Sequence, residues 1–88
     1  MNQENLHERI EVNTTFTRSR PQCIPKSFYR DNGREIIITE IGLVHPKYDG
    51  LRTNYAFDVT DGQADYRLIF ETERLAWYLE WIGDYDAK

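Results

Sequence analysis

Polar and apolar residues alternate along much of the chain, and this alternation predicts β-strands. From residue 9 onward, Ile10, Val12, Thr14 and Phe16 can all face the same side, as in a strand with one buried face. Residues 1–8 are polar and show no period, so we expect a flexible tail there. The segment RSRPQCIPK that follows contains two prolines, which cannot donate to a β-ladder, and it predicts a linker or a surface loop.

The dipeptide Asn32-Gly33 predicts a β-hairpin, because asparagine and glycine readily take the positive φ angles of a tight turn. A two-residue loop would place Arg30 opposite Glu35 and Phe28 opposite Ile37, which matches charge with charge and apolar with apolar. Residues 36–41 continue as a strand. The segment GLVHPKYDGLR (42–52) carries two glycines and a proline, and it predicts a longer connection at the edge of the sheet.

Asp61-Gly62 predicts a second hairpin between two further strands. A two-residue loop would pair Val59 with Ala64 and would place Phe57, Tyr66, Tyr55 and Leu68 on the same face. The same register places Asp58 opposite Asp65, which is an unfavourable pair of like charges.

The aromatic segment LAWYLEWIGDYD (75–86) fits both a strand and a helix by periodicity. Tryptophan, tyrosine and isoleucine favour strands, and the four residues ETER before it suit a turn, so we expect a closing strand, with a helix over 72–82 as the alternative. The elements add up to a mainly β fold of about six strands. We expect one domain over residues 9–86, built as a strongly bent antiparallel sheet or a small SH3-like barrel.

The segments IPKSFYRDNGREIIITEI, NYAFDVTDGQADYRLIF and AWYLEWIGDYD carry a resemblance. Over residues 25–86 the chain resembles a family of small, uncharacterised bacterial β-rich domains, some of which are encoded near DNA-repair polymerase-like proteins. That family has a basic, tryptophan-rich loop where this chain has GLVHPKYDGLR, and the resemblance supplies no catalytic residues.

Charge is distributed unevenly along the chain. The formal net charge is −4, but residues 12–34 have a net charge of +4 and residues 58–86 a net charge of −6. A basic segment interleaved with aromatic residues is typical of single-strand nucleic-acid binding, where cations contact phosphates and rings stack on bases. The residues of this candidate surface are Arg18, Arg20, Lys26, Arg30, Arg34 and Tyr29.

The aromatic residues of the last strand divide between two predicted roles. Trp77, Leu79 and Trp81 share one face of the expected strand and are predicted to fill the core. The opposite face stays partly exposed and would form a partner surface made of Tyr78, Ile82 and Tyr85. We therefore predict a non-enzymatic binding module for a protein partner or for self-association, with single-stranded nucleic acid as the alternative partner.

Other chemistries find little support in the residues present. Cys23, His45 and Asp49 are the only candidates for a thiol nucleophile with its base and orienting group, and nothing in their spacing brings them together. Asp58, Asp61 and Asp65 lack the spacing of a calcium loop, so no metal and no cofactor are expected. The lone cysteine and the absence of a long apolar run predict a cytoplasmic protein that is not inserted in a membrane.

Overall fold

The computed structural model describes residues 3–20 and 22–84 of the chain, and every regular element in this part is a β-strand. Seven strands form one antiparallel sheet in the order β3-β2-β1-β7-β6-β5-β4. The strands are β1 (Gln3–Phe16), β2 (Cys23–Tyr29), β3 (Glu35–Ile37), β4 (Glu40–Asp49), β5 (Arg52–Thr60), β6 (Ala64–Glu71) and β7 (Ala76–Asp84). No helix that could cross a membrane occurs among the described residues.

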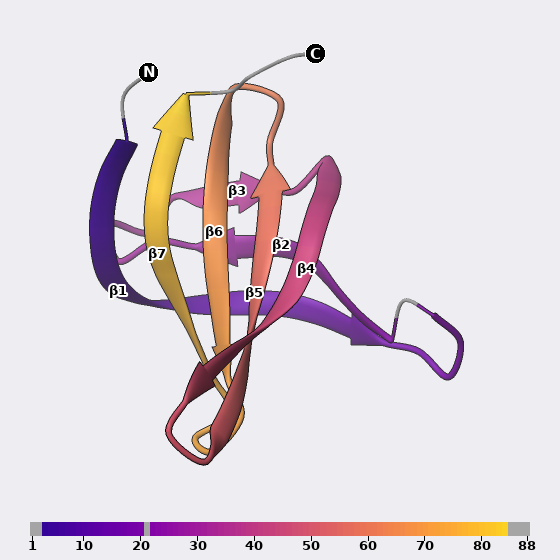
Figure 1. Ribbon diagram of the computed structural model, residues 1–88. Helices are drawn as coiled ribbons and strands as arrows, with labels where there is room; N and C mark the ends of the chain where they lie inside the picture. The colour runs from indigo at the N-terminus through magenta and orange to yellow at the C-terminus, as the bar shows by residue number, and fades with distance from the viewer. Residues whose placement is uncertain (1–2, 21, 85–88) are drawn as a thin grey trace.

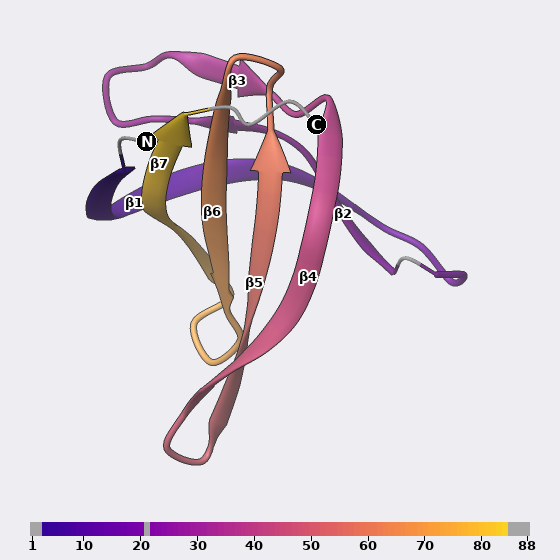
Figure 2. The ribbon, with the colours of Figure 1, turned by 45° about the horizontal axis from the view of Figure 1, so that its top comes forward.

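The sheet curls into a half-barrel because β1 belongs to both of its parts (Figure 1). The first half of β1 runs alongside β7, β6, β5 and β4, whereas its second half bends and crosses behind these strands together with β2 and β3 (Figures 1 and 2). An extra residue on β1 between Asn5 and Glu8 interrupts its register with β7 and increases the local twist. The result is a front layer and a back layer that cross at a steep angle.

The core lies between these two layers and consists of the inward-facing residues of both. Phe28, Leu68 and Leu79 are completely buried, and Phe28 meets Tyr66 edge to face. The remaining members of the cluster are Ile10, Ile36, Phe57, Val59 and Trp77. The predicted fold class, a small and strongly bent antiparallel sheet, is therefore confirmed, with seven strands in place of about six.

The closed end of the half-barrel is the end at which β3 lies, with the β2–β3 turn before it and the corner where the chain passes to β4 after it (Figure 1). Thr39 donates from its backbone N–H and from its hydroxyl to the carbonyl of Thr60, at 2.9 and 3.2 Å. The backbone N–H of Ile38 donates to the carbonyl of Lys26. The two bonds from Thr39 join the corner to β5 in the front layer, and the bond from Ile38 joins it to β2 in the back layer.

Both predicted hairpins form, but their loops are longer than expected. In the first, Phe28 lies opposite Ile36, and Arg30 and Arg34 close a three-residue loop in which Gly33 has a φ of 84°. The predicted pairing of Arg30 with Glu35 is wrong, because Glu35 lies opposite Tyr29. Asn-Gly suits a two-residue turn, but it suits equally well a three-residue loop whose last residue is a glycine with positive φ. The Asn32 side chain supports this turn by accepting a hydrogen bond from the backbone N–H of Arg34.

In the second hairpin, Val59 lies opposite Tyr66, so the predicted register is wrong by two residues although the predicted faces are right. The reason is the Asp61 carboxylate, which accepts hydrogen bonds from the backbone N–H groups of Gln63 and Ala64 and so builds a longer turn. The shift places Asp58 opposite Arg67 and removes the expected clash of aspartates.

Three segments take a different form from the one predicted. Residues 3–8, expected as a tail, belong to β1, because they pair with β7. Residues 42–49, expected as a connection, are part of the edge strand β4. The proline-containing segment RSRPQCIPK, expected as a linker or loop, becomes part of strand β2 from Cys23 onward. The alternative helix over 72–82 does not form, since residues 72–75 make a turn and β7 begins at Ala76.

Candidate binding groove at the open end

The second half of β1 has one edge without a strand partner. Ile10 is the last residue of β1 that pairs with β7, opposite Trp77, and Glu11 is the first that pairs with β2, opposite Tyr29. From Glu11 to Phe16, no strand among residues 3–20 and 22–84 pairs with the edge of β1 that faces away from β2. Such an edge presents unpaired N–H and C=O groups of alternate residues.

A groove of about 520 Å³ lies along this free edge, and we call it the β1 groove. The strands of the front layer continue past β1 (Figure 1), so their inner face forms the second wall. Phe16 is 66% exposed and Leu75 is 74% exposed, whereas Trp77 is buried beneath them. The residues that line the groove are Arg9, Ile10, Glu11, Val12, Thr14, Phe16, Phe70, Leu75, Ala76 and Trp77.

Leu75 is held at the mouth of the groove in a strained backbone conformation. Its φ is 55°, in the left-handed region that bulky side chains avoid, and no other non-glycine residue of the described chain has a positive φ. The turn that carries it is anchored by Thr72, whose backbone N–H donates to Asn54 Oδ1 and whose hydroxyl donates to the Thr53 carbonyl. An exposed leucine is thus kept where a glycine would be more stable.

Thr14 adds a polar group to this apolar groove. Its Oγ1 is buried and makes no hydrogen bond in the described structure. A buried hydroxyl without a partner costs free energy, so native structures usually satisfy it. The Thr14 hydroxyl is therefore an unsatisfied polar group in the wall of the groove.

The structure places the predicted basic residues in three separate regions. Arg18 and Arg20 lie exposed at the tip of the β1–β2 hairpin, which projects past β4 (Figure 1). Lys26 occupies a bulge on β2, because Asn13 pairs with Ser27 and Thr14 with Pro25. Arg30 and Arg34 flank the β2–β3 turn at the closed end.

Arg30 forms an ion pair with Glu8. Its guanidinium donates to both oxygens of Glu8, at 2.7 and 3.2 Å, and Glu8 also accepts a hydrogen bond from the backbone N–H of Asp31. The Glu8 side chain points inward from β1 and is only 11% exposed. The hydrogen bonds from Arg30 lower the pKa of Glu8 below its ordinary value, and they outweigh the opposing effect of burial.

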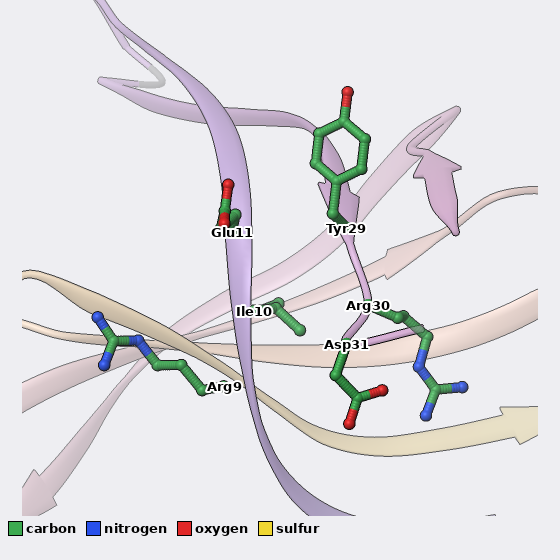
Figure 3. A pocket seen from close by; sticks show the side chains of 6 residues that line it. All are labelled: Arg9, Ile10, Glu11, Tyr29, Arg30 and Asp31. Carbon is green, nitrogen blue, oxygen red and sulfur yellow. The ribbon is translucent and has the colours of Figure 1, made fainter. Parts of the chain in front are cut away.

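Tyr29 lies in an acidic environment, which disfavours a role in stacking on nucleic-acid bases. Its cross-strand neighbours are Glu11 on β1 and Glu35 on β3. A second, smaller pocket of about 300 Å³ lies where β1 bends, and it is lined by Arg9, Ile10, Glu11, Tyr29, Arg30 and Asp31 (Figure 3). Arg9 lies on one side of β1 and Tyr29, Arg30 and Asp31 on the other, so the charged groups do not converge on one point (Figure 3).

The predicted partner surface on the last strand is divided by a bulge at Glu80. Leu68 pairs with Leu79 but Arg67 pairs with Trp81, so the alternation along β7 reverses between these two residues. As a result, Ile82 packs against the core, whereas Trp81 turns outward and lies under the Arg67 guanidinium.

Tyr78 faces outward, but it is covered. His7 stacks on its ring with 4.5 Å between the centroids, and the guanidinium of Arg9 lies 5.9 Å from the ring centre. Tyr85 lies outside the described residues. Around these rings, Arg67 binds Asp58 in a two-point ion pair, and Lys47 binds Glu80, so charged side chains occupy much of the outer face of the front layer.

The catalytic and metal alternatives gain nothing from the structure. Cys23 lies on β2 and His45 on β4, and these two strands do not contact each other in the described chain. Burial raises the pKa of the Cys23 thiol, which is the opposite of what a nucleophile needs. The described residues contain no cluster of histidine, cysteine or carboxylate side chains that could hold a metal ion.

Asp61 has a structural role at the closed end. Burial opposes its ionisation, but the hydrogen bonds from the backbone N–H groups of Ala64 and Gln63 and from the Tyr66 hydroxyl lower its pKa. Burial and the Asp61 carboxylate in turn raise the pKa of Tyr66 to about 12. The carboxylate is thus fully occupied within its own turn.

Sequence reasoning did not identify the β1 groove as a site. The alternation of residues 9–16 predicts only that Phe16 faces the same side as Ile10, and the expected closing strand includes Leu75. One signal was present: an apolar residue directly after the four turn-forming residues ETER, at a position where a turn often ends with a glycine.

Comparisons of the chain with models of protein families, with curated proteins and with solved structures find no match. The resemblance to small bacterial β-rich domains therefore stays a prediction. The function must be inferred from the chain's own residues.

Proposed function

We propose that this chain is a protein-interaction module that binds a polypeptide in the β1 groove. The observation that carries the proposal is the pair of exposed apolar side chains, Phe16 and Leu75, on the two walls of a groove floored by Trp77. Contiguous exposed apolar surface bordered by polar residues is typical of binding sites for other proteins.

Two further features support a binding role. Leu75 keeps a strained backbone conformation although its side chain gains little burial in the free protein. Strain of this kind persists where the surrounding structure enforces it, and it is often found at ligand-binding positions. The buried Thr14 hydroxyl in the same groove has no partner within the described chain.

A selection from a random peptide library displayed on phage tests the proposal. The immobilised full chain should enrich peptides that bind it in solution, and the double variant Phe16→Ser/Leu75→Ser should bind them at least about tenfold more weakly, because two exposed apolar contacts are lost. The control is Leu43→Ser/Leu51→Ser, since both leucines are also exposed but lie outside the groove, on β4 and in the β4–β5 turn. Selection of no peptide that depends on Phe16 and Leu75 would overturn the proposal.

Single-stranded nucleic acid is a second candidate ligand. The observation that favours it is the projecting hairpin, which presents Arg18 and Arg20 close to the exposed ring of Phe16. Cations that contact phosphates next to an aromatic platform suit a single strand. The acidic neighbours of Tyr29 and the ion pair of Arg30 weigh against an extension of this surface along β2.

Amide NMR titration of the labelled protein with a mixed-sequence single-stranded oligonucleotide separates the two candidates. Binding through the hairpin would shift the resonances of Phe16, Arg18 and Arg20, and it would weaken steeply between low and moderate salt. The double variant Arg18→Ala/Arg20→Ala should then abolish the shifts. No shifts at low salt would remove the nucleic-acid function.

A further inference from the structure

The free edge of β1 from Glu11 to Phe16 differs from the free edge of β4 in its protection against strand pairing. The outer edge of β4 carries Pro46, which lacks an N–H, and Lys47, and a bulge at Gly42 and Leu43 interrupts its register opposite Asp58. These are the devices by which natural proteins prevent the addition of a strand. The free edge of β3 spans only Glu35–Ile37.

The β1 edge has none of these devices. Its sequence from Glu11 to Phe16 is EVNTTF, without proline, glycine or lysine, and it is rich in β-branched residues. The bulge in its ladder with β2 lies on the β2 side, at Lys26, so β1 itself is regular over these residues. Six residues of strand span about 20 Å, which is enough for several backbone hydrogen bonds to one added strand.

The inner wall of the groove suits the side chains that such a strand would carry. Successive side chains of a strand point to opposite faces, so every second one would meet Phe70, Leu75 and Trp77, and the others would face away from the front layer. Alternating apolar and polar residues therefore fit, and the side chains of Phe16 and Leu75 would be covered.

The charges at the two ends of the free edge indicate which end of an added strand should be acidic. Arg18 and Arg20 are exposed at the Phe16 end of the free edge, and neither forms an ion pair with a described residue, whereas Glu11 is exposed at the other end. An antiparallel strand would begin next to the two arginines, so acidic residues at its amino end would be attracted there.

We propose that the β1 groove binds an extended segment of a partner protein by β-strand addition: the segment pairs antiparallel with Glu11–Phe16, has alternating apolar residues and is acidic at its amino end. The proposal rests on the proposed function and specifies how the partner binds. Main-chain hydrogen bonds would supply part of the affinity, and the apolar wall and the arginines would supply selectivity.

The probe is an eight-residue synthetic peptide with two aspartates followed by alternating valine and threonine. The critical test uses two versions that carry N-methyl groups on opposite sets of alternate amides. In an added strand, only one set faces β1, so one version should bind at least about tenfold more weakly than the other. Two versions that bind equally would overturn strand addition.

Two further measurements complete the test. Hydrogen exchange of the Glu11–Phe16 amides should slow in the presence of the peptide, and the Arg18→Glu/Arg20→Glu variant should prefer a peptide with two lysines in place of the aspartates. The phage selection could yield peptides that need Phe16 and Leu75 for binding but do not slow exchange of the Glu11–Phe16 amides. That result would overturn strand addition but would leave the proposed function standing. Slow exchange of the same amides in a self-associated protein without peptide would identify a second copy as the occupant and would also overturn the proposal.

Discussion

The two ends of the half-barrel differ in the partners that their polar side chains find within the protein. At the closed end, Glu8 is held by Arg30, Asp61 by the turn that it builds, and Thr39 by Thr60. At the open end, Phe16 and Leu75 are exposed, and the Thr14 hydroxyl is buried without a partner. The polar groups named at the closed end have partners within the protein, whereas the Thr14 hydroxyl at the open end has none in the described chain.

This difference follows from the length of β1. Pairing between β1 and β7 ends at Ile10, although β1 continues to Phe16. The last six residues of β1 therefore pair only with β2 among the described strands. On the inward face of β1, Ile10 therefore belongs to the core, whereas Thr14 and Phe16 line the groove. Stability is therefore expected to depend mainly on the closed end and binding on the open end.

The largest contrast in stability is expected between Ile10 and Phe16, which have the same parity on β1. Ile10→Ala removes a buried side chain and should lower the free energy of unfolding by about 2–4 kcal/mol. Phe16→Ala removes a mostly exposed ring and should cost less than about 1 kcal/mol. Urea unfolding with both variants gives the comparison. Equal losses would mean that Phe16 is buried in solution and that the groove is not open.

The ion pair at the closed end is expected to give the next largest effect. Glu8→Gln leaves the half-buried Arg30 guanidinium without its charged partner and should cost about 2 kcal/mol. Glu11→Gln is the matched control, because Glu11 is exposed on the opposite face of the same strand, and it should change stability by less than about 0.5 kcal/mol. A negligible loss for Glu8→Gln would show that the closed end does not depend on this pair.

Acid should weaken the same contact in a defined direction. The folded-state pKa of Glu8 lies below the ordinary value of 4.5, so its contribution is complete above pH 4.5 and is lost as the pH falls through the lowered pKa. We expect the stability of the wild-type protein to fall below pH 4.5 more steeply than that of Glu8→Gln. Thermal unfolding at a series of pH values provides the measurement, and parallel curves for the two proteins would contradict the prediction.

The alternation of apolar and polar residues predicted which side chains share a face of a strand, and the structure confirms these faces for β1, β5 and β6. It did not show which positions on that face would be covered, because coverage of Phe16 depends on where β7 begins, about sixty residues later in the chain. Neither could it show the bulge at Glu80, which exchanges the faces of Trp81 and Ile82. A bulge arises from the pairing of two strands, and one strand's pattern contains no sign of it.

The candidate sites depended more strongly on tertiary structure. The basic residues are close together in sequence, but Arg30 meets Glu8 across 22 positions, and that contact removes it from the predicted surface. The groove combines β1 with the β6–β7 turn, and no local motif relates these two segments. Sequence therefore predicted the fold class, whereas the proximity of β1 to the β6–β7 turn became visible only in the tertiary structure.

The strain at Leu75 predicts a smaller effect of opposite sign. Leu75→Gly relieves the left-handed conformation, and after the added entropy of the unfolded glycine is subtracted, the protein should gain about 0.5–1 kcal/mol. Leu51→Gly is the control, since Leu51 is also exposed in a turn but has no positive φ, and it should give no gain. A loss of stability for Leu75→Gly would mean that the leucine side chain packs in the free protein.

The smallest effect is expected at Thr14, and here stability and binding should change in opposite directions. Thr14→Val removes a buried hydroxyl that has no partner and keeps the shape of the side chain, so stability should rise by up to about 1 kcal/mol. Thr15→Val, at an exposed position next to it, should change stability by less than about 0.5 kcal/mol. Urea unfolding measures both variants.

If a bound peptide supplies the missing partner, Thr14→Val should also weaken binding of the selected peptides by a few-fold, because the variant cannot make the new hydrogen bond. A Thr14→Val variant that is more stable and binds less well would show that the Thr14 hydroxyl forms a hydrogen bond with the bound peptide. A variant that is more stable and binds equally well would show that the free protein carries this cost for another reason, and the contrast between the two ends would then rest on Phe16 and Leu75 alone.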